Sequence, residues 1–126
     1  HDGRSVRERT MAHEPLGPAA FLGDVLNDLA KTIDARAGAD PASSWTAKLL
    51  MGGPALTAKK LGEEGVEAAL AVASQDDTAV ASEAADLVYH LLVALRSRGV
   101  TLDVLAKALE ARQGKSGIDE KASRGS

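Results

Sequence analysis

The sequence contains no cysteine, which excludes disulfides, thiol nucleophiles and zinc sites built from thiolates. Aromatic residues are also scarce, because Phe21, Trp45 and Tyr89 are the only ones in 126 residues. So few rings argue against a stacking platform for single-stranded nucleic acid. The formal net charge of -3 lacks the basic excess of a duplex-binding domain, so no nucleic acid is expected as a partner.

Long apolar runs are missing as well. None approaches the roughly 20 residues that a membrane span needs, so no membrane contact is expected. No secretory signal is recognisable, since charges and prolines interrupt residues 6–20. The lack of cysteine is compatible with a reducing compartment such as the cytosol.

Alanine and leucine, with 24 and 16 residues, dominate what is present, and both favour helices. The length predicts a single domain. Apolar periodicity, caps and breakers divide it into a disordered extension (1–17), a helical domain (18–112) and a C-terminal tail (113–126). The short connections predict an all-α, antiparallel helical bundle of about five helices. The expected helices cover residues 18–37, 45–51, 55–75, 79–98 and 102–112.

Acidic residues are distributed unusually along the third and fourth expected helices. Seven carboxylates and no lysine or arginine lie between Glu63 and Asp86. At about 100° per residue, Glu63 and Glu67 share one side of their helix with apolar residues, and Glu83 and Asp86 border the apolar face of the next. Burying such charges without a partner is costly. The apolar neighbours on the first helix are Leu56, Val66 and Leu70.

A pocket of carboxylate oxygens between two antiparallel helices suits a hard cation such as Mg²⁺ better than zinc. The candidate ligands are Glu63, Glu64, Glu67, Glu83 and Asp86. Two plainer interpretations stay open. The pattern also describes a solvated acidic face, and the charges could form ion pairs at a dimer seam with Lys59, Lys60 or arginines.

Cations flank this acidic zone. Metal ions and cations together are what phosphoryl chemistry requires, and Lys60 stands one turn before Glu64. The alternative for Lys60 is a simple i,i+4 pair with Glu64. His90 is interpreted as a structural hydrogen-bonding residue, and Trp45 as the residue that anchors its helix, with a base-stacking surface as the alternative.

Three blocks of the sequence carry a family resemblance, and together they extend over about residues 20–124. They read SSWTAKLLMGGPALTAKKLGEEGVEAALA (43–71), EAADLVYHLLVAL (83–95) and RQGKSGIDEKASR (112–124). In this order they resemble the phosphoribosyl-ATP pyrophosphatases of histidine biosynthesis, which are similar to the MazG-like all-α nucleotide pyrophosphohydrolases. The paired acidic motifs alone indicate only the superfamily.

The resemblance implies hydrolysis of phosphoribosyl-ATP to phosphoribosyl-AMP and pyrophosphate by a cytoplasmic homodimer that uses Mg²⁺, with Mn²⁺ as the alternative ion. It assigns the five carboxylates to the metal. Glu64 is our choice for the base that activates water, and Glu63 is the second catalytic candidate. The resemblance also implies phosphate contacts from Lys48 and Lys60. The tail residues that match the family's ending are Ser116, Glu120, Lys121 and Arg124, of which Lys121 and Arg124 are expected at the substrate.

Two rival functions remain. One is a house-cleaning enzyme of the MazG type that acts on aberrant nucleoside triphosphates. The other is a helical interaction module whose acidic stripe meets a basic partner.

Overall fold

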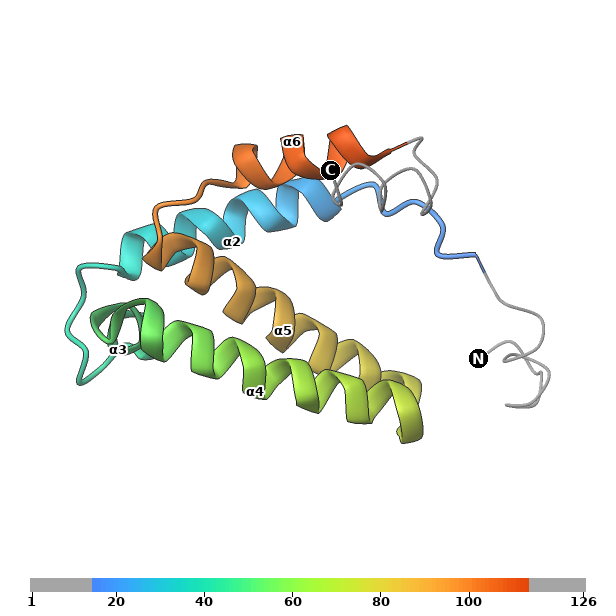
Figure 1. The fold of residues 1–126 in the computed structure, drawn as a ribbon, viewed down its shortest axis with the longest axis horizontal. Coiled ribbons are helices and arrows are strands. Elements are labelled where there is room, and N and C mark those ends of the chain that lie inside the picture. Colours follow the sequence, from blue (N-terminus) through green and yellow to red (C-terminus); the bar gives the residue numbers. More distant parts are fainter. Residues whose placement is uncertain (1–14, 114–126) are drawn as a thin grey trace, which may run out of the picture.

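The structure is a computed structural model that describes residues 15–113. This part of the chain is helical and contains no strand, which confirms the all-α prediction. Helices α4 and α5 form a long antiparallel hairpin, and α3 lies at its open end, opposite the turn that joins the two helices (Figure 1). The helices are α2 (Leu22–Arg36), α3 (Trp45–Met51), α4 (Gly53–Ser74), α5 (Asp77–Ser97) and α6 (Leu102–Arg112).

Side-chain caps start three of the helices. Ser44 accepts a hydrogen bond from the backbone N–H of Ala47 at α3, and Asp76 accepts one from Ala79 at α5. Thr101 does the same for α6. Each cap satisfies a backbone donor that has no partner within the helix. The sequence predicts a cap at Ser43 or Ser44 and another at Thr101, and the structure confirms Ser44 and Thr101.

The small hydrophobic core lies where α2, α3 and α5 meet. It consists of Ile33 on α2, Leu49 on α3, and Leu92 and Val93 on α5. Leu49 is completely buried and holds α3 in place. Partly buried residues from the same helices and from α4 and α6 pack around this centre.

Two hydroxyl pairs fasten the same end of the hairpin. Thr46 Oγ1 lies 2.6 Å from Tyr89 Oη and joins α3 to α5. Thr57 Oγ1 lies 2.8 Å from Ser97 Oγ and joins α4 to α5. Since these groups are partly buried, each satisfies a partner that would otherwise lose its hydrogen bond to water.

Three helix starts differ from the prediction, and one of them is α5, which begins at Asp77 in place of residue 79 because Asp76 caps it. Helix α2 begins at Leu22 and not at residue 18. Phe21 occupies the cap position without a side-chain hydrogen bond, and the residues before it form only a turn in which the N–H of Leu22 donates to the carbonyl oxygen of Ala19. Helix α4 begins at Gly53, so Gly52 alone separates it from α3. Gly53 has a φ of 69°, the left-handed region that glycine adopts without strain.

Helices α2 and α6 contribute little to the core. Helix α6 has no buried residue, and α2 has only Ile33. Apolar side chains of both helices face outward, with Leu22 and Val25 55% and 56% exposed.

Helix α5 is the one helix in residues 15–113 whose length and composition would suit a membrane span, with a mean hydropathy of 1.3. Its apolar stretch, however, carries Glu83 and Asp86. Charged groups within a span are rare and expensive. The helix instead packs along α4.

We expect the substitution Gly53→Ala to lower the free energy of unfolding by about 1–2 kcal/mol, the cost of a side chain in the left-handed region. The matched control is Gly62→Ala in the middle of α4, where a Cβ meets nothing within 4 Å. That change should stabilise the protein by about 0.5–1 kcal/mol because alanine loses less backbone entropy. Urea denaturation measures both, and equal effects would contradict this account of the α3–α4 junction.

Candidate active site

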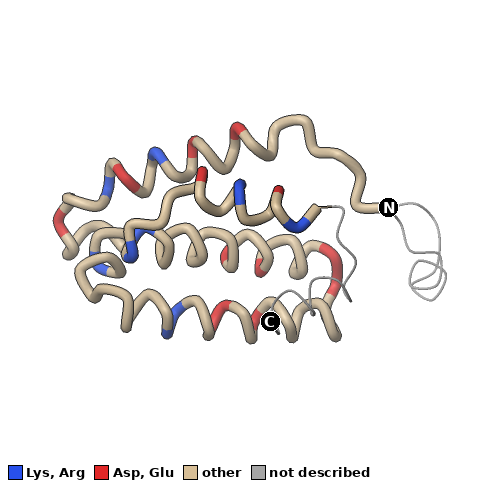
Figure 2. Tube along the Cα trace, turned by 45° about the horizontal axis from the view of Figure 1, so that its top comes forward, with Lys and Arg blue, Asp and Glu red and all other residues tan. Residues whose placement is uncertain are grey.

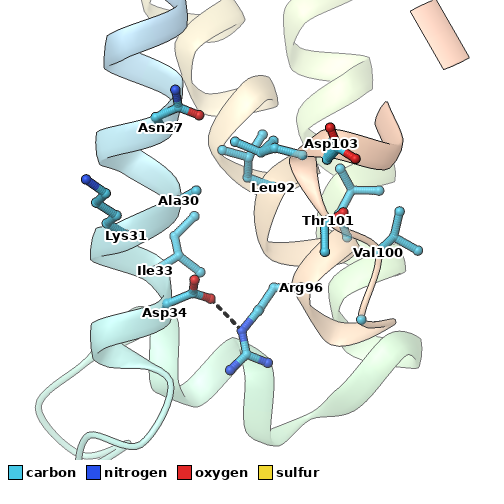
Figure 3. Close-up of a pocket in the computed structure, with 13 residues that line it drawn as sticks. Asn27, Ala30, Lys31, Ile33, Asp34, Leu92, Arg96, Val100, Thr101 and Asp103 are labelled. Carbon is cyan, nitrogen blue, oxygen red and sulfur yellow. Dashed lines mark hydrogen bonds and ion pairs between the residues drawn. The ribbon is translucent and has the colours of Figure 1, made fainter. Parts of the chain in front are cut away.

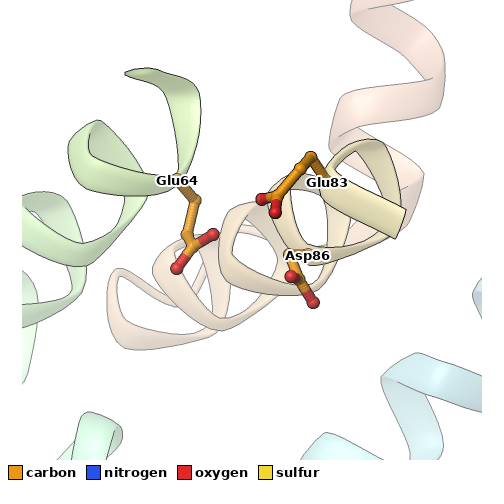
Figure 4. A group of neighbouring side chains, drawn as sticks. All are labelled: Glu64, Glu83 and Asp86. Atoms are coloured by element: carbon orange, nitrogen blue, oxygen red, sulfur yellow. The ribbon is translucent and has the colours of Figure 1, made fainter. Parts of the chain in front are cut away.

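Three carboxylates converge on the seam between α4 and α5. One oxygen from each of Glu64, Glu83 and Asp86 lies within 4.8 Å of the others (Figure 4). Glu83 and Asp86 are three residues apart and so share a face of α5. Figure 2 shows the acidic segments of both helices toward the turn that joins them.

The surroundings of Glu83 in this cluster shift the pKa of its carboxyl group. Partial burial raises the pKa of Glu83 above its ordinary value of 4.5, and the carboxylates of Asp86, Glu67 and Glu64 raise it further. The ionised form is therefore under strain that a bound cation would relieve. A set of carboxylate oxygens is also the donor chemistry that hard divalent ions prefer. The residues fit such an ion.

The remaining two predicted ligands lie beside this group. Glu67 is exposed but close enough to Glu83 to affect its pKa. Glu63 is also exposed, and its Oε2 lies 3.3 Å from Nζ of Lys60. The alternative interpretation of Lys60, an i,i+4 pair with Glu64, is thus replaced by an i,i+3 pair with Glu63, and Glu64 faces the seam.

The expected burial of the Glu63 and Glu67 side of α4 is wrong. Val66 and Leu70 on that side are 60% and 52% exposed. The face that meets α5 instead contains the buried residues Thr57 and Ala71. Small side chains allow the two helices to approach closely, whereas the helical-wheel argument gave the greatest weight to the largest apolar residues.

His90 supports the site through the backbone. Its ring is buried, and Nδ1 donates a hydrogen bond of 2.8 Å to the carbonyl oxygen of Asp86. The ring also lies edge-on to Tyr89 at a centroid distance of 4.9 Å. This contact agrees with the structural role predicted for His90.

Trp45 is not the anchor of α3. Its side chain remains 49% exposed, while Leu49 fills the core from the same helix. The ring centroid lies 5.9 Å from Nζ of Lys48 and 5.7 Å from Nζ of Lys60. The two lysines predicted to contact phosphate therefore gather around one indole.

The predicted tail residues lie outside the described part of the chain. They are Ser116, Glu120, Lys121 and Arg124.

A cavity of about 760 Å³ lies between α2, the end of α5 and the start of α6 (Figure 3). An ion pair of 2.7 Å between Asp34 and Arg96 crosses its edge. Ile33 and Leu92 contribute apolar lining, and none of the clustered carboxylates borders it. The cavity therefore lacks the convergent acidic groups of the α4–α5 seam.

Comparison with known proteins identifies the family to which the chain belongs. A family model described as phosphoribosyl-ATP pyrophosphohydrolase matches residues 26–113. The chain belongs to the phosphoribosyl-ATP pyrophosphohydrolase family. This confirms the resemblance recognised in the sequence, and with it the prediction that the protein is a hydrolase.

Relatives in this pyrophosphohydrolase family match most of the chain. A protein of Caulobacter vibrioides named phosphoribosyl-ATP pyrophosphatase is 58% identical over 103 residues, which cover 82% of this chain and 95% of the relative. Proteins of the same name from Cereibacter sphaeroides and Methylobacterium radiotolerans are 58% and 57% identical. Those matches cover 80% and 79% of this chain, and 98% and 92% of the relatives.

We expect Glu83→Gln to make the metal-free protein more stable at neutral pH. A carboxyl whose pKa is raised by folding binds protons more readily in the folded state, so its contribution to stability falls as pH rises through the raised pKa. Glutamine removes that penalty. The melting temperature in EDTA should rise, and its difference from the wild type should shrink when the pH is lowered below about 4.5.

The same variant should lose the increase in melting temperature that Mg²⁺ or Mn²⁺ produces in the wild type. Loss of a direct ligand should weaken metal binding by at least the roughly 10–100-fold known for outer-shell partners. Glu110→Gln, an equivalent change at an exposed position on α6, is the control and should alter neither property. A wild type that shows no response to either ion would favour the interaction module.

Proposed function

We propose that the protein hydrolyses phosphoribosyl-ATP to phosphoribosyl-AMP and pyrophosphate in a Mg²⁺-dependent reaction, the second step of histidine biosynthesis. The observation that carries this proposal is the convergence of Glu64, Glu83 and Asp86 in a chain of the phosphoribosyl-ATP pyrophosphohydrolase family. The names of the relatives supply the substrate. Mn²⁺ is the expected substitute ion.

In this proposal Glu64, Glu83 and Asp86 would hold the metal, and Glu63 and Glu67 would complete the acidic set from α4. Bound Mg²⁺ would polarise the phosphoryl group and lower the pKa of water. Glu64 then accepts the proton of the attacking water on a carboxylate oxygen. Lys60 and Lys48 bind phosphate oxygens and offset the negative charge of the departing pyrophosphate.

Lys60 is suited to this work by its pairing with Glu63. The ion pair is on the surface, where it contributes at most about 1 kcal/mol. An incoming polyphosphate can therefore displace the glutamate at little cost. Lys60 also lies one turn from Glu64, so phosphate held by the lysine lies next to the acidic seam.

A homodimer in the cytoplasm is the second part of the proposal. Val66 and Leu70 form an exposed apolar pair on the same side of α4 as Glu63 and Glu67. In a two-fold symmetric dimer, the same pair on the second copy would pack against this pair and bury both. Such an interface would also shield the carboxylates from water and strengthen their attraction for a cation.

We expect Glu64→Gln to reduce Mg²⁺-dependent pyrophosphate release by about 10²–10⁴-fold, the range for loss of a general base. The helical circular dichroism spectrum should not change, because glutamine keeps the size of the side chain. Glu110→Gln on α6 should retain full activity. Unchanged turnover of the Glu64 variant would refute the assignment.

A comparison of substrates separates the proposed reaction from house-cleaning activity. The acidic seam by itself suits any nucleoside triphosphate, so the relatives carry the choice of substrate. We expect kcat/KM for phosphoribosyl-ATP to exceed that for each standard deoxynucleoside triphosphate. The reverse order would assign the protein to the MazG-type enzymes.

We expect Leu70→Asp to weaken the dimer, because a charge would enter the apolar pair that meets its symmetry copy. Sedimentation velocity at micromolar concentration should show a shift toward monomer. Val72→Asp is the matched control, because Val72 is also exposed on α4 but lies on the opposite side of the helix from Glu63. A wild type that sediments as a folded, active monomer would overturn the proposed dimer.

A further inference from the structure

The indole of Trp45 is an exposed aromatic surface with no packing role to explain it. It occupies the first position of α3, and half of its side chain contacts solvent although the core lies nearby. The neighbouring residues Thr46 and Ala47 are buried instead. About half of the indole therefore remains available for contact with a ligand.

Two ammonium groups border this ring from different helices. Nζ of Lys48 lies 5.9 Å and Nζ of Lys60 lies 5.7 Å from the ring centroid. Attraction between an exposed ring and a hydrated ammonium group is weak, so a stronger ligand can displace either lysine from it. The arrangement therefore combines an exposed aromatic ring with two cations that a ligand can displace from it.

The ring is also continuous with the acidic seam. Lys60, Glu64 and Glu67 follow one another at i, i+4 and i+7 and so share one side of α4. Lys60 stands between the indole and the carboxylate of Glu63. Along this side the structure presents an aromatic surface, then cations, then carboxylates.

A nucleoside triphosphate has the complementary order of base, phosphates and bound cation. We propose that Trp45 is the surface on which the adenine base of the substrate stacks, with Lys48 and Lys60 binding the phosphates that lead to the carboxylate seam. This assigns Trp45 as a substrate-binding and specificity-determining residue. It rests on the proposed function for the identity of the base, but the stacking itself can be measured with ATP alone.

The kinetic test compares Trp45→Leu with Trp45→Phe. We expect the leucine variant to raise KM for phosphoribosyl-ATP roughly tenfold, which lies within the range of base–aromatic stacking, with kcat changed much less. The phenylalanine variant keeps an aromatic face and should recover most of the affinity. Met51→Ala is the control, because Met51 is exposed on the same helix but lies about 120° away around it.

A binding test needs neither metal nor turnover. Trp45 is the only tryptophan in the sequence, so the intrinsic indole fluorescence reports this position alone. We expect ATP in EDTA to quench it at lower concentration than tripolyphosphate, which carries the phosphates without a base. In displacement assays with an unrelated fluorescent nucleotide, Trp45→Leu should weaken the binding of ATP but not the binding of tripolyphosphate.

The outcomes separate the two proposals. If the wild type hydrolyses phosphoribosyl-ATP but Trp45→Leu keeps the KM of the wild type, the stacking proposal is overturned and the reaction stands. Equal loss of ATP and tripolyphosphate in the leucine variant would also overturn it, because a structural effect would not distinguish the base. If the wild type fails to hydrolyse phosphoribosyl-ATP, the metal-free ATP titration still decides the role of Trp45.

Discussion

Repulsion between the carboxylates of Glu64, Glu83 and Asp86 is the force that the rest of the structure has to withstand. Burial raises the pKa of Glu83, repulsion from the neighbouring carboxylates raises it further, and this repulsion works against the approach of α4 to α5. Much of the hairpin's support lies elsewhere, because the core cluster around Leu49 and the two hydroxyl pairs lie toward the end where α3 packs. Stability and chemistry thus occupy different ends of the same two helices, as expected where a functional site carries strain.

The separation explains the composition of the seam. A bulky apolar pair between the helices would hold the carboxylates too far apart to share one ion, whereas Ala71 and Thr57 permit close packing. The bulky residues Val66 and Leu70 are displaced to the outer surface. The same requirement accounts for the thin core of the single chain, and it makes a second copy the natural cover for the apolar surface.

The helices were predictable because their signals are local. Breakers and caps such as Ser44 and Thr101 act within a few residues, and the five segments have the predicted order. The orientation of α4 was not predictable from amphipathicity, since the wheel cannot recognise a buried face made of alanine and threonine. The exposure of Trp45 was equally inaccessible, because it depends on Leu49 filling the core first. The choice of acidic residues came from charge placement and the family motif together.

The junction at Gly52 has a consequence for the variation in length that the chain can tolerate. With a single residue between α3 and α4, the two helices keep a fixed register, and a Cβ at Gly52 would collide with the side chain of Leu56. An inserted residue here would rotate the indole and Lys48 away from Lys60 and Glu64. Residues 37–44, by contrast, form a surface connection that can absorb insertions without disturbing that spacing. The distance between the residues of the site on α3 and those on α4 is therefore set by a junction of one residue.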